Sequence, residues 1–248
     1  MFLPLYDVNR LRFIRLQYVT WAIIAANVLV QAAMWSLSDT QFDEIASVSL
    51  GYIPALANEL AVLPPDLAFV PERATYLTYA FLHGGWMHLG VNMLFLWVFG
   101  DNVEDALGHV RFAVFYALCA AAGAYAHGLL APDSEAPLIG ASGAVAGVSA
   151  AYLILHPRVR LWTLVLYRIP LPLPAWIPLG VWVATQFMMI VRDPFGPISW
   201  AAHVGGILMG ALLVLVMRRP GVPLFDRRIV PPEAAVLAPP GGPVRAGR

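Results

Sequence analysis

The two residues best suited to chemistry in this chain are Ser142 and His203, each inside an apolar stretch. Ser142 stands within Gly-Ala-Ser-Gly at 140–143, and His203 stands within Ala-His-Val-Gly-Gly at 202–206. Polar and ionisable groups at membrane depth are costly, so they usually serve a function. A serine hydroxyl can attack an amide when a neighbouring imidazole takes its proton. Because neither stretch contains a carboxylate, the pattern predicts a serine–histidine dyad without a third member.

Small residues near both side chains predict that their helices pack closely. Gly143 and Gly147 are four residues apart, and so are Gly206 and Gly210. This spacing places two glycines on one helix face and allows two backbones to approach each other. Such a contact would bring the serine hydroxyl to the imidazole. A purely structural interpretation stays open, because a lone membrane serine often only bonds to a carbonyl of its own helix.

A second polar pair, His88 and Asn92, is four residues apart and therefore shares one helix face. Both side chains can donate a hydrogen bond to an oxyanion, together with the backbone N–H of Ser142 at a helix N-terminus. A zinc site formed by His83, His88 and His203 is the competing interpretation. No His-Glu-x-x-His pattern and no acidic residue at this depth support it. We therefore predict no metal and no cofactor.

Composition places the chain among membrane proteins with several spans. Hydrophobic residues make up 60% of the 248 residues, charged residues make up 12%, and the mean hydropathy is +0.71. Soluble domains contain about 25% charged residues. The one cysteine, Cys119, rules out an intrachain disulfide, and we expect it to pack as a small apolar side chain. Lipids and membrane proteins are the predicted partners, and nucleic acid is not.

Six apolar segments have roughly the length that a bilayer crossing needs, which is ~20 residues. They cover residues 18–37, 85–100, 111–131, 141–155, 173–191 and 198–217. With the N-terminus inside, every arginine except Arg73 and Arg192 also lies inside, as the positive-inside rule requires. The predicted fold class is an all-α polytopic membrane protein, a bundle of six transmembrane helices with both termini inside.

Three regions are predicted along the chain. Residues 1–17 form a cytoplasmic N-terminal segment, and residues 18–217 form the six-helix domain. Residues 218–248 are rich in proline, glycine and arginine and are expected to form a disordered cytoplasmic tail. The connection 38–75 mixes prolines with many apolar residues, which a solvated linker would not need. We expect it to be a structured loop, partly embedded in the outer half of the membrane.

This topology places the polar residues at one depth. The second, fourth and sixth segments enter from the outside, and His88, Ser142 and His203 lie within about two turns of their helix starts. The fourth segment, with about 15 residues, spans only ~22 Å of a ~30 Å hydrocarbon core. Its start is therefore expected to be recessed. Irregular backbone at that depth is tolerated only beside protein or a water-filled cavity, so the serine should face water.

These motifs resemble the rhomboid family of intramembrane serine proteases. The matching elements are His88-x-x-x-Asn92, the Gly-Ala-Ser-Gly run around Ser142, and the Ala-His-Val-Gly-Gly-x-x-x-Gly run that begins before His203. They occur in the family's order and on the expected helices, and the resemblance covers about residues 15–217. It implies a rhomboid-like bundle in which Ser142 is the nucleophile and His203 is the general base. It also implies that His88 and Asn92 contribute to the oxyanion hole.

Two positions depart from the family's pattern. Many rhomboids carry Trp-Arg in the first outer loop, where this chain offers only Glu72-Arg73. Some members place a tyrosine four residues after the serine, where it stacks on the catalytic histidine, but this chain has Ala146 there. The histidine must therefore be held otherwise, by Trp200 or by helix packing alone.

The resemblance also implies lateral substrate access between the second and fifth helices. Trp182 and Phe187, which are bulky residues of the fifth segment, are expected to line this route. Cleavage requires local unwinding of a helical substrate, so suitable substrates carry helix-weakening glycine or proline near the cut.

The leading prediction is a serine-type intramembrane endopeptidase that hydrolyses peptide bonds in or near transmembrane segments of membrane proteins. A catalytically silent rhomboid-like protein that binds membrane clients is the alternative, although silent relatives commonly lose the serine or the histidine. A transporter is disfavoured because neither internal repeats nor charged pathway residues occur. No mitochondrial presequence and no seventh span are evident, so a bacterial plasma membrane is the expected location.

Overall fold

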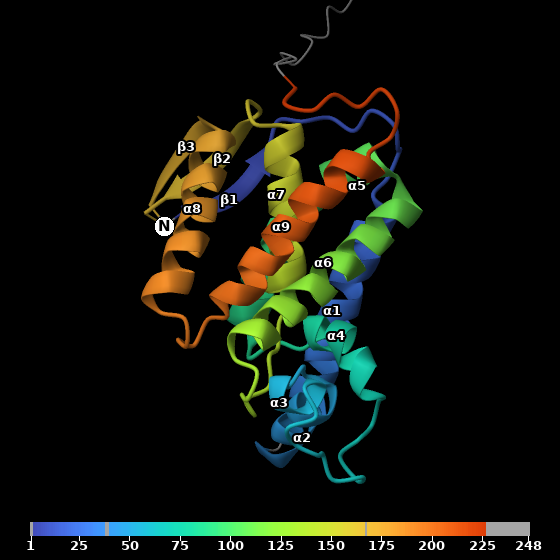
Figure 1. Cartoon of the computed structure of the whole chain (residues 1–248). Coiled ribbons are helices and arrows are strands. Elements are labelled where there is room, and N and C mark those ends of the chain that lie inside the picture. Colours follow the sequence, from blue (N-terminus) through green and yellow to red (C-terminus); the bar gives the residue numbers. More distant parts are fainter. Residues whose placement is uncertain (1, 38–39, 167, 227–248) are drawn as a thin grey trace, which may run out of the picture.

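The computed structural model of this chain describes residues 2–37, 40–166 and 168–226. Its elements are β1 Phe2–Asp7, α1 Tyr18–Leu37, α2 Thr40–Leu50, α3 Pro54–Ala57, η1 Glu72–Ala74, α4 Thr75–Thr78, η2 Tyr79–Phe81, α5 Trp86–Leu107, α6 His109–Leu130, α7 Ser142–Leu155, β2 Arg160–Val165, β3 Ile169–Pro174, α8 Trp176–Arg192 and α9 Trp200–Met217. Each predicted apolar segment coincides with one long helix (Figure 1), so the predicted helical bundle is confirmed.

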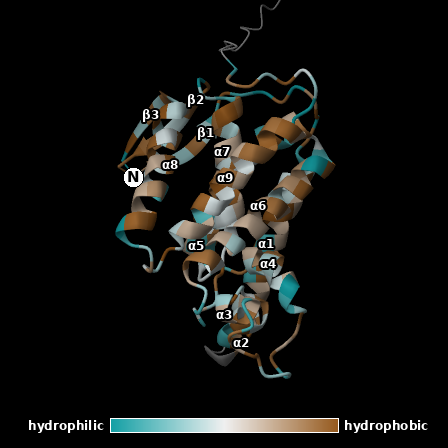
Figure 2. Ribbon diagram, viewed as in Figure 1, coloured by the Kyte–Doolittle hydropathy of each residue, from teal (hydrophilic) through white to brown (hydrophobic). Residues whose placement is uncertain are grey.

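The described helices differ in their suitability for crossing a membrane. By length and composition, α1, α6 and α9 could each span a bilayer, whereas α7 and α8 are shorter apolar helices. Apolar colour covers much of the bundle, and the hydrophilic segments gather in the connections at its two ends (Figure 2). The number of spans and their orientation stay predictions.

Helix α7 lies at the centre of the bundle because its residues are mostly small. Every residue from Gly143 to Tyr152 is buried. Helix α9 packs along α7 more extensively than any other element, and α5 and α6 cover further faces (Figure 1). A helix that is apolar all round needs neighbours on every side. Ser142 begins this enclosed helix, so its surroundings are set by the bundle.

A small antiparallel sheet, which the sequence did not predict, accompanies the bundle. Its strand order is β1-β2-β3, so the N-terminal segment pairs with the connection between α7 and α8. On the central strand, Leu161 and Thr163 are fully buried and share one face of the sheet, as alternate residues of a strand do. Strand β3 carries proline at 170, 172 and 174, which suits an edge strand because proline donates no hydrogen bond.

Strand β1 is tied to the bundle through Asp7. The Tyr152 hydroxyl of α7 donates to Asp7 Oδ2 at 2.6 Å, and the Asn102 amide of α5 donates to the same oxygen at 3.1 Å. Burial raises the pKa of Asp7 to about 7. The strand therefore depends on a carboxyl group that titrates near neutral pH.

Two carboxylates at the end of α5 hold the first turn of α1 and the segment before it. Glu104 is fully buried and accepts hydrogen bonds from the backbone N–H groups of Val19 and Thr20 at 3.0 and 2.8 Å. Asp105 accepts from the backbone N–H groups of residues 12–14 at 2.7–2.8 Å. The N–H groups of Val19 and Thr20 lie in the first turn of α1, where no carbonyl of the helix can accept from them, and Glu104 supplies the acceptor. These contacts anchor α5, whose other end carries His88.

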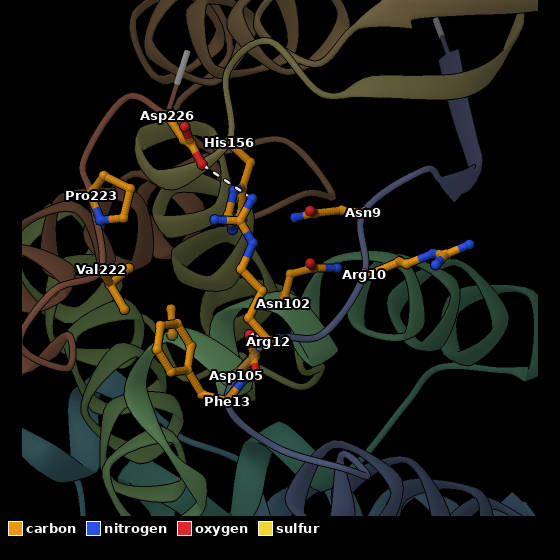
Figure 3. Close-up of a pocket in the computed structure, with 11 residues that line it drawn as sticks. Asn9, Arg10, Arg12, Phe13, Asn102, Asp105, His156, Val222, Pro223 and Asp226 are labelled. Carbon is orange, nitrogen blue, oxygen red and sulfur yellow. Dashed lines mark hydrogen bonds and ion pairs between the residues drawn. The ribbon is translucent and has the colours of Figure 1, made fainter. Parts of the chain in front are cut away.

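The start of the predicted tail is ordered. The backbone of Arg219 donates to Ala106 at 2.8 Å, and that of Asp226 donates to Leu155 at 3.0 Å. Arg12 and Asp226 form an ion pair at 3.5 Å beside a pocket where the N-terminal and C-terminal segments meet (Figure 3). The predicted disordered tail is therefore wrong for residues 218–226. Residues 227–248 lie outside the described residues.

The long outer connection is structured over residues 40–75 and supports the turn before Ser142. Tyr52, Ile53 and Ala55 are buried. The backbones of Tyr52 and Leu138 exchange two hydrogen bonds, at 3.1 and 2.8 Å. The connection thereby fixes the segment that leads into α7. Its depth in a membrane stays a prediction.

Candidate active site

Ser142 is the first residue of α7 and is half-buried. The turn before it is held by Tyr79, whose backbone carbonyl accepts from the N–H of Gly140 at 3.0 Å. Gly140 has φ +121°, a conformation that side-chain-bearing residues rarely adopt. A Cβ at this position would also lie 2.8 Å from His88 Cε1. Only glycine allows this turn and this approach of the His88 ring together.

His88 directs a nitrogen toward the same turn. Its Nε2 lies 2.9 Å from the point that a Cβ on Gly140 would occupy, and Ser142 Oγ lies 3.9 Å from that point. The N–H of Gly84 donates to His88 Nδ1 at 3.4 Å. A neutral imidazole that accepts at Nδ1 carries its proton at Nε2. His88 therefore offers an N–H donor close to Ser142.

Asn92 lies one turn further along α5 and is 5% exposed. Its side-chain nitrogen donates to the backbone carbonyl of His88 at 3.1 Å. A primary amide has two N–H donors, so this bond leaves the second one for a ligand. The two predicted oxyanion residues thus lie on one face of α5.

His83 contributes to the site in a way that the sequence did not reveal. It is buried, its ring lies edge-on to His88 at 5.0 Å, and its Nε2 accepts from the backbone N–H of Ala141 at 3.5 Å. It also lines a cavity of about 280 Å³ together with Ile139 and residues 84–86. Among the described residues, no group of three His, Cys, Asp or Glu residues is arranged to hold a metal. His83 connects the turn before Ser142 to this cavity.

The start of α9 is fixed by a cap. The hydroxyl of Ser199 accepts from the N–H of Ala202 at 3.2 Å and lies 2.9 Å from His127 Nδ1 on α6. A serine at the N-cap satisfies an otherwise free N–H of the first helical turn. This cap holds the turn of α9 that carries His203.

His203 has its closest side-chain partners on α8 and on its own helix. Its Nδ1 lies 2.7 Å from the side-chain oxygen of Gln186. The ring of Trp200 stands edge-on to it at 5.9 Å, and the ring of Trp182 is tilted against it at 6.4 Å. Trp200 was one of the two expected supports of the histidine, beside helix packing alone, whereas Gln186 was not identified. A buried amide in an apolar helix was the signal that could have revealed it.

Close backbone contact between α7 and α9 relates Ser142 to His203. A Cβ on Gly206 would overlap the Gly143 carbonyl oxygen, and a Cβ on Gly210 would overlap that of Gly147. Ser142 precedes the first of these contacts along α7, and His203 precedes it along α9. In the described part of the chain, no hydrogen bond joins the serine hydroxyl to the imidazole. Catalytic hydrogen bonds are often long without substrate.

The two aromatic residues expected to line the access route lie in different environments. Trp182 is half-buried, and its ring is 6.0 Å from Phe95 of α5. Phe187 is 40% exposed. Trp182 therefore lies between α8 and α5 beside His203, and Phe187 points toward the surroundings.

Comparison with known proteins shows which family the chain belongs to. The rhomboid domain model matches residues 71–220. The chain is 33% identical to rhomboid protein 1, mitochondrial, of Saccharomyces cerevisiae over 58% of its own length and 42% of that protein's. It is 29% identical to human rhomboid-related protein 3 over 74% of its length and 47% of that protein's. The chain thus spans about half the length of the curated relatives that it matches. This chain belongs to the rhomboid family of membrane proteins.

Proposed function

We propose that this protein is an intramembrane serine endopeptidase with Ser142 as nucleophile and His203 as general base. The observation that carries the proposal is the turn at Gly140, where Ser142 Oγ and His88 Nε2 lie near one point at the start of α7. Backbone contact with α9 brings the start of the His203 helix beside it. A nucleophile, a base and an oxyanion donor are the groups that acyl transfer needs.

In the first step, His203 Nε2 takes the proton of Ser142 as Oγ attacks the scissile carbonyl carbon. The resulting oxyanion is stabilised by the N–H of Ser142 at the start of α7, by His88 Nε2–H and by the second N–H of Asn92. The carbon–nitrogen bond then breaks, and the imidazolium gives its proton to the departing amine. The product is an acyl group on Ser142.

The second step requires water at an enclosed serine. Water attacks the acyl carbon while His203 accepts one of its protons. The bond between the acyl carbon and Ser142 Oγ then breaks, the imidazolium returns the proton to Oγ, and the carboxylic product leaves. The cavity of about 280 Å³ beside His83 offers space for water next to the turn that precedes the serine. Polar groups line it, including Gln31, Asp43 and Ser47, which supports a wet cavity.

Substrates of such a site are transmembrane proteins whose helix unwinds easily near the cut, through glycine or proline. They would reach the site laterally between α5 and α8. The relatives named above include a mitochondrial protein, and other family members are chloroplastic. A bacterial plasma membrane remains the proposed location.

The test is cleavage of a reporter transmembrane substrate by the purified protein, together with labelling by a fluorophosphonate. Ser142→Ala should abolish both signals. Ser149→Ala is the matched control, because that hydroxyl of the same helix only donates to the Val145 carbonyl at 2.9 Å. Cleavage that persists in Ser142→Ala would refute the proposal.

The second candidate is a silent rhomboid-like protein that binds membrane clients without cutting them. It is favoured by one observation, namely that no hydrogen bond joins Ser142 to His203 in the described structure. Binding of a transmembrane client with neither cleavage nor labelling would support this function over proteolysis.

A further inference from the structure

Gln186 is a buried amide on an apolar helix, and both ends of its side chain are engaged. It is 2% exposed. Its Nε2 donates to the backbone carbonyl of Trp182 at 3.0 Å, and its Oε1 lies 2.7 Å from His203 Nδ1. An amide buried in an apolar environment is costly unless it is hydrogen-bonded. These two contacts satisfy it, and one of them reaches the base of the proposed dyad.

The two partners determine which way the amide faces. A backbone carbonyl only accepts, so the amide nitrogen must face Trp182 and the amide oxygen must face His203. That oxygen also only accepts, so His203 Nδ1 carries the proton. A neutral imidazole has one N–H, and its Nε2 therefore presents a lone pair. This is the tautomer that can take a proton from a serine hydroxyl.

Space for this contact comes from the small residue at position 146. Ala146, Ala150 and Ile207 form a buried cluster, against which Trp182 and Val183 of α8 pack. A large aromatic ring at position 146 would need the volume next to this cluster. The alanine lets α8 approach, so that side chains of α8 reach His203.

We propose that Gln186 is a positioning residue that holds His203 in its basic tautomer and orientation, an inference that rests on the proposed proteolytic function. Trp182 packs on the same imidazole from one turn earlier on α8. The support that some relatives obtain from an aromatic ring after the serine is supplied here by α8. Displacement of α8 would therefore disorient the base.

The experiment compares variants at position 186 in the full-length protein, with a transmembrane substrate. Gln186→Met keeps most of the volume and removes the acceptor, whereas Gln186→Glu keeps an acceptor oxygen toward Nδ1. Thr185→Val is the matched control, because the Thr185 hydroxyl donates only to Val181 of its own helix at 2.8 Å. Thermal unfolding is recorded for each variant. Should Gln186→Met fail to fold, Gln186→Asn replaces it, because its shorter side chain cannot reach both partners.

We expect Gln186→Met to lower kcat by about 10- to 100-fold with little change in KM. This loss is part of the ~10²- to 10⁴-fold rate enhancement that a positioned base contributes. Loss of the acceptor destabilises the imidazolium, so the acid limb of the kcat/KM profile should move to lower pH. Gln186→Glu should keep kcat within about threefold of the wild-type value, because a carboxyl oxygen can still accept from Nδ1–H. Thr185→Val should match the wild type.

Two results would overturn the inference while leaving the proposed function standing. One is a folded Gln186→Met variant with wild-type kcat and an unshifted acid limb. The other is a Gln186→Glu variant as impaired as Gln186→Met, since an acceptor oxygen toward Nδ1 would then make no difference to activity. If the wild-type protein neither cleaves nor labels, the proposed function itself has failed.

Discussion

Replacement of Gly206 by alanine tests whether the contact between α7 and α9 sets the geometry of the dyad. The new Cβ would overlap the Gly143 carbonyl oxygen and would lie 2.7 Å from the Gly143 carbonyl carbon. Carbon atoms pack at about 3.5–4.0 Å. Backbone atoms cannot rotate away as a side chain would, so the two helices must separate, by about 1 Å to restore an ordinary contact.

This separation has two measurable consequences. Overpacking of a well-filled core costs about 1–3 kcal/mol. A reacting group that is misplaced by ~1 Å loses about 10²-fold in rate. Because Ser142 and His203 belong to the two separated helices, we expect kcat/KM to fall about 100-fold while most molecules remain folded.

The assay measures cleavage of a transmembrane substrate and thermal unfolding for Gly206→Ala and for two control variants. Gly90→Ala and Gly180→Ala place a Cβ where, apart from the nearby backbone of the same helix, no atom of the described residues lies within 4 Å. Both residues lie within helices, where alanine is favoured over glycine by about 1 kcal/mol. The controls should therefore be active and slightly more stable than the wild type. Full activity in a folded Gly206→Ala variant would refute the idea that this contact positions the dyad.

Two further predictions concern Asp7 and the residues of α8. Burial raises the pKa of Asp7 from 3.8 to about 7. The folded state therefore binds this proton more tightly than the unfolded state. As pH rises from about 4 to about 7, Asp7 lowers the free energy of unfolding. In thermal unfolding, the stability advantage of Asp7→Asn over the wild type should thus grow across that range and stay constant above pH ~7. A stability difference between the two proteins that does not depend on pH would contradict this prediction. Trp182→Ala should lower kcat for a membrane-embedded substrate about tenfold, the effect of a loss of ~1.4 kcal/mol, because Trp182 packs on both His203 and Phe95. Phe187→Ala should have little effect, since that ring is 40% exposed. Wild-type kcat in Trp182→Ala would show that the contacts of Trp182 with His203 and Phe95 do not matter for activity.

The elements of the bundle were predictable from local patterns. Long apolar segments mark the helices, because a bilayer crossing demands continuous apolar sequence. Gly143 and Gly147 are four residues apart, and so are Gly206 and Gly210. The first pair lies on α7 and faces the second pair on α9. The catalytic assignments of Ser142 and His203 came from motif and depth, and they stay predictions.

The sheet and the ordered segment 218–226 escaped prediction because nothing local marks them. Strand β1 has six residues at the chain start, and β3 alternates proline with apolar residues, which locally disfavours a strand. Each becomes stable only by pairing with β2 or with the bundle. Residues 218–226 are likewise ordered by backbone hydrogen bonds to α5 and α7.

The sequence by itself determined the apolar helices, the small-residue faces and the placement of a serine, histidines and an asparagine near helix starts. Periodicity and composition carry this information, because they are properties of single segments. Only the tertiary structure decided which side chain holds His203. Gln186 and His203 are 17 residues apart on different helices, and they meet because Ala146 leaves space for α8. Contacts of this kind depend on how helices pack in three dimensions, which no single segment encodes.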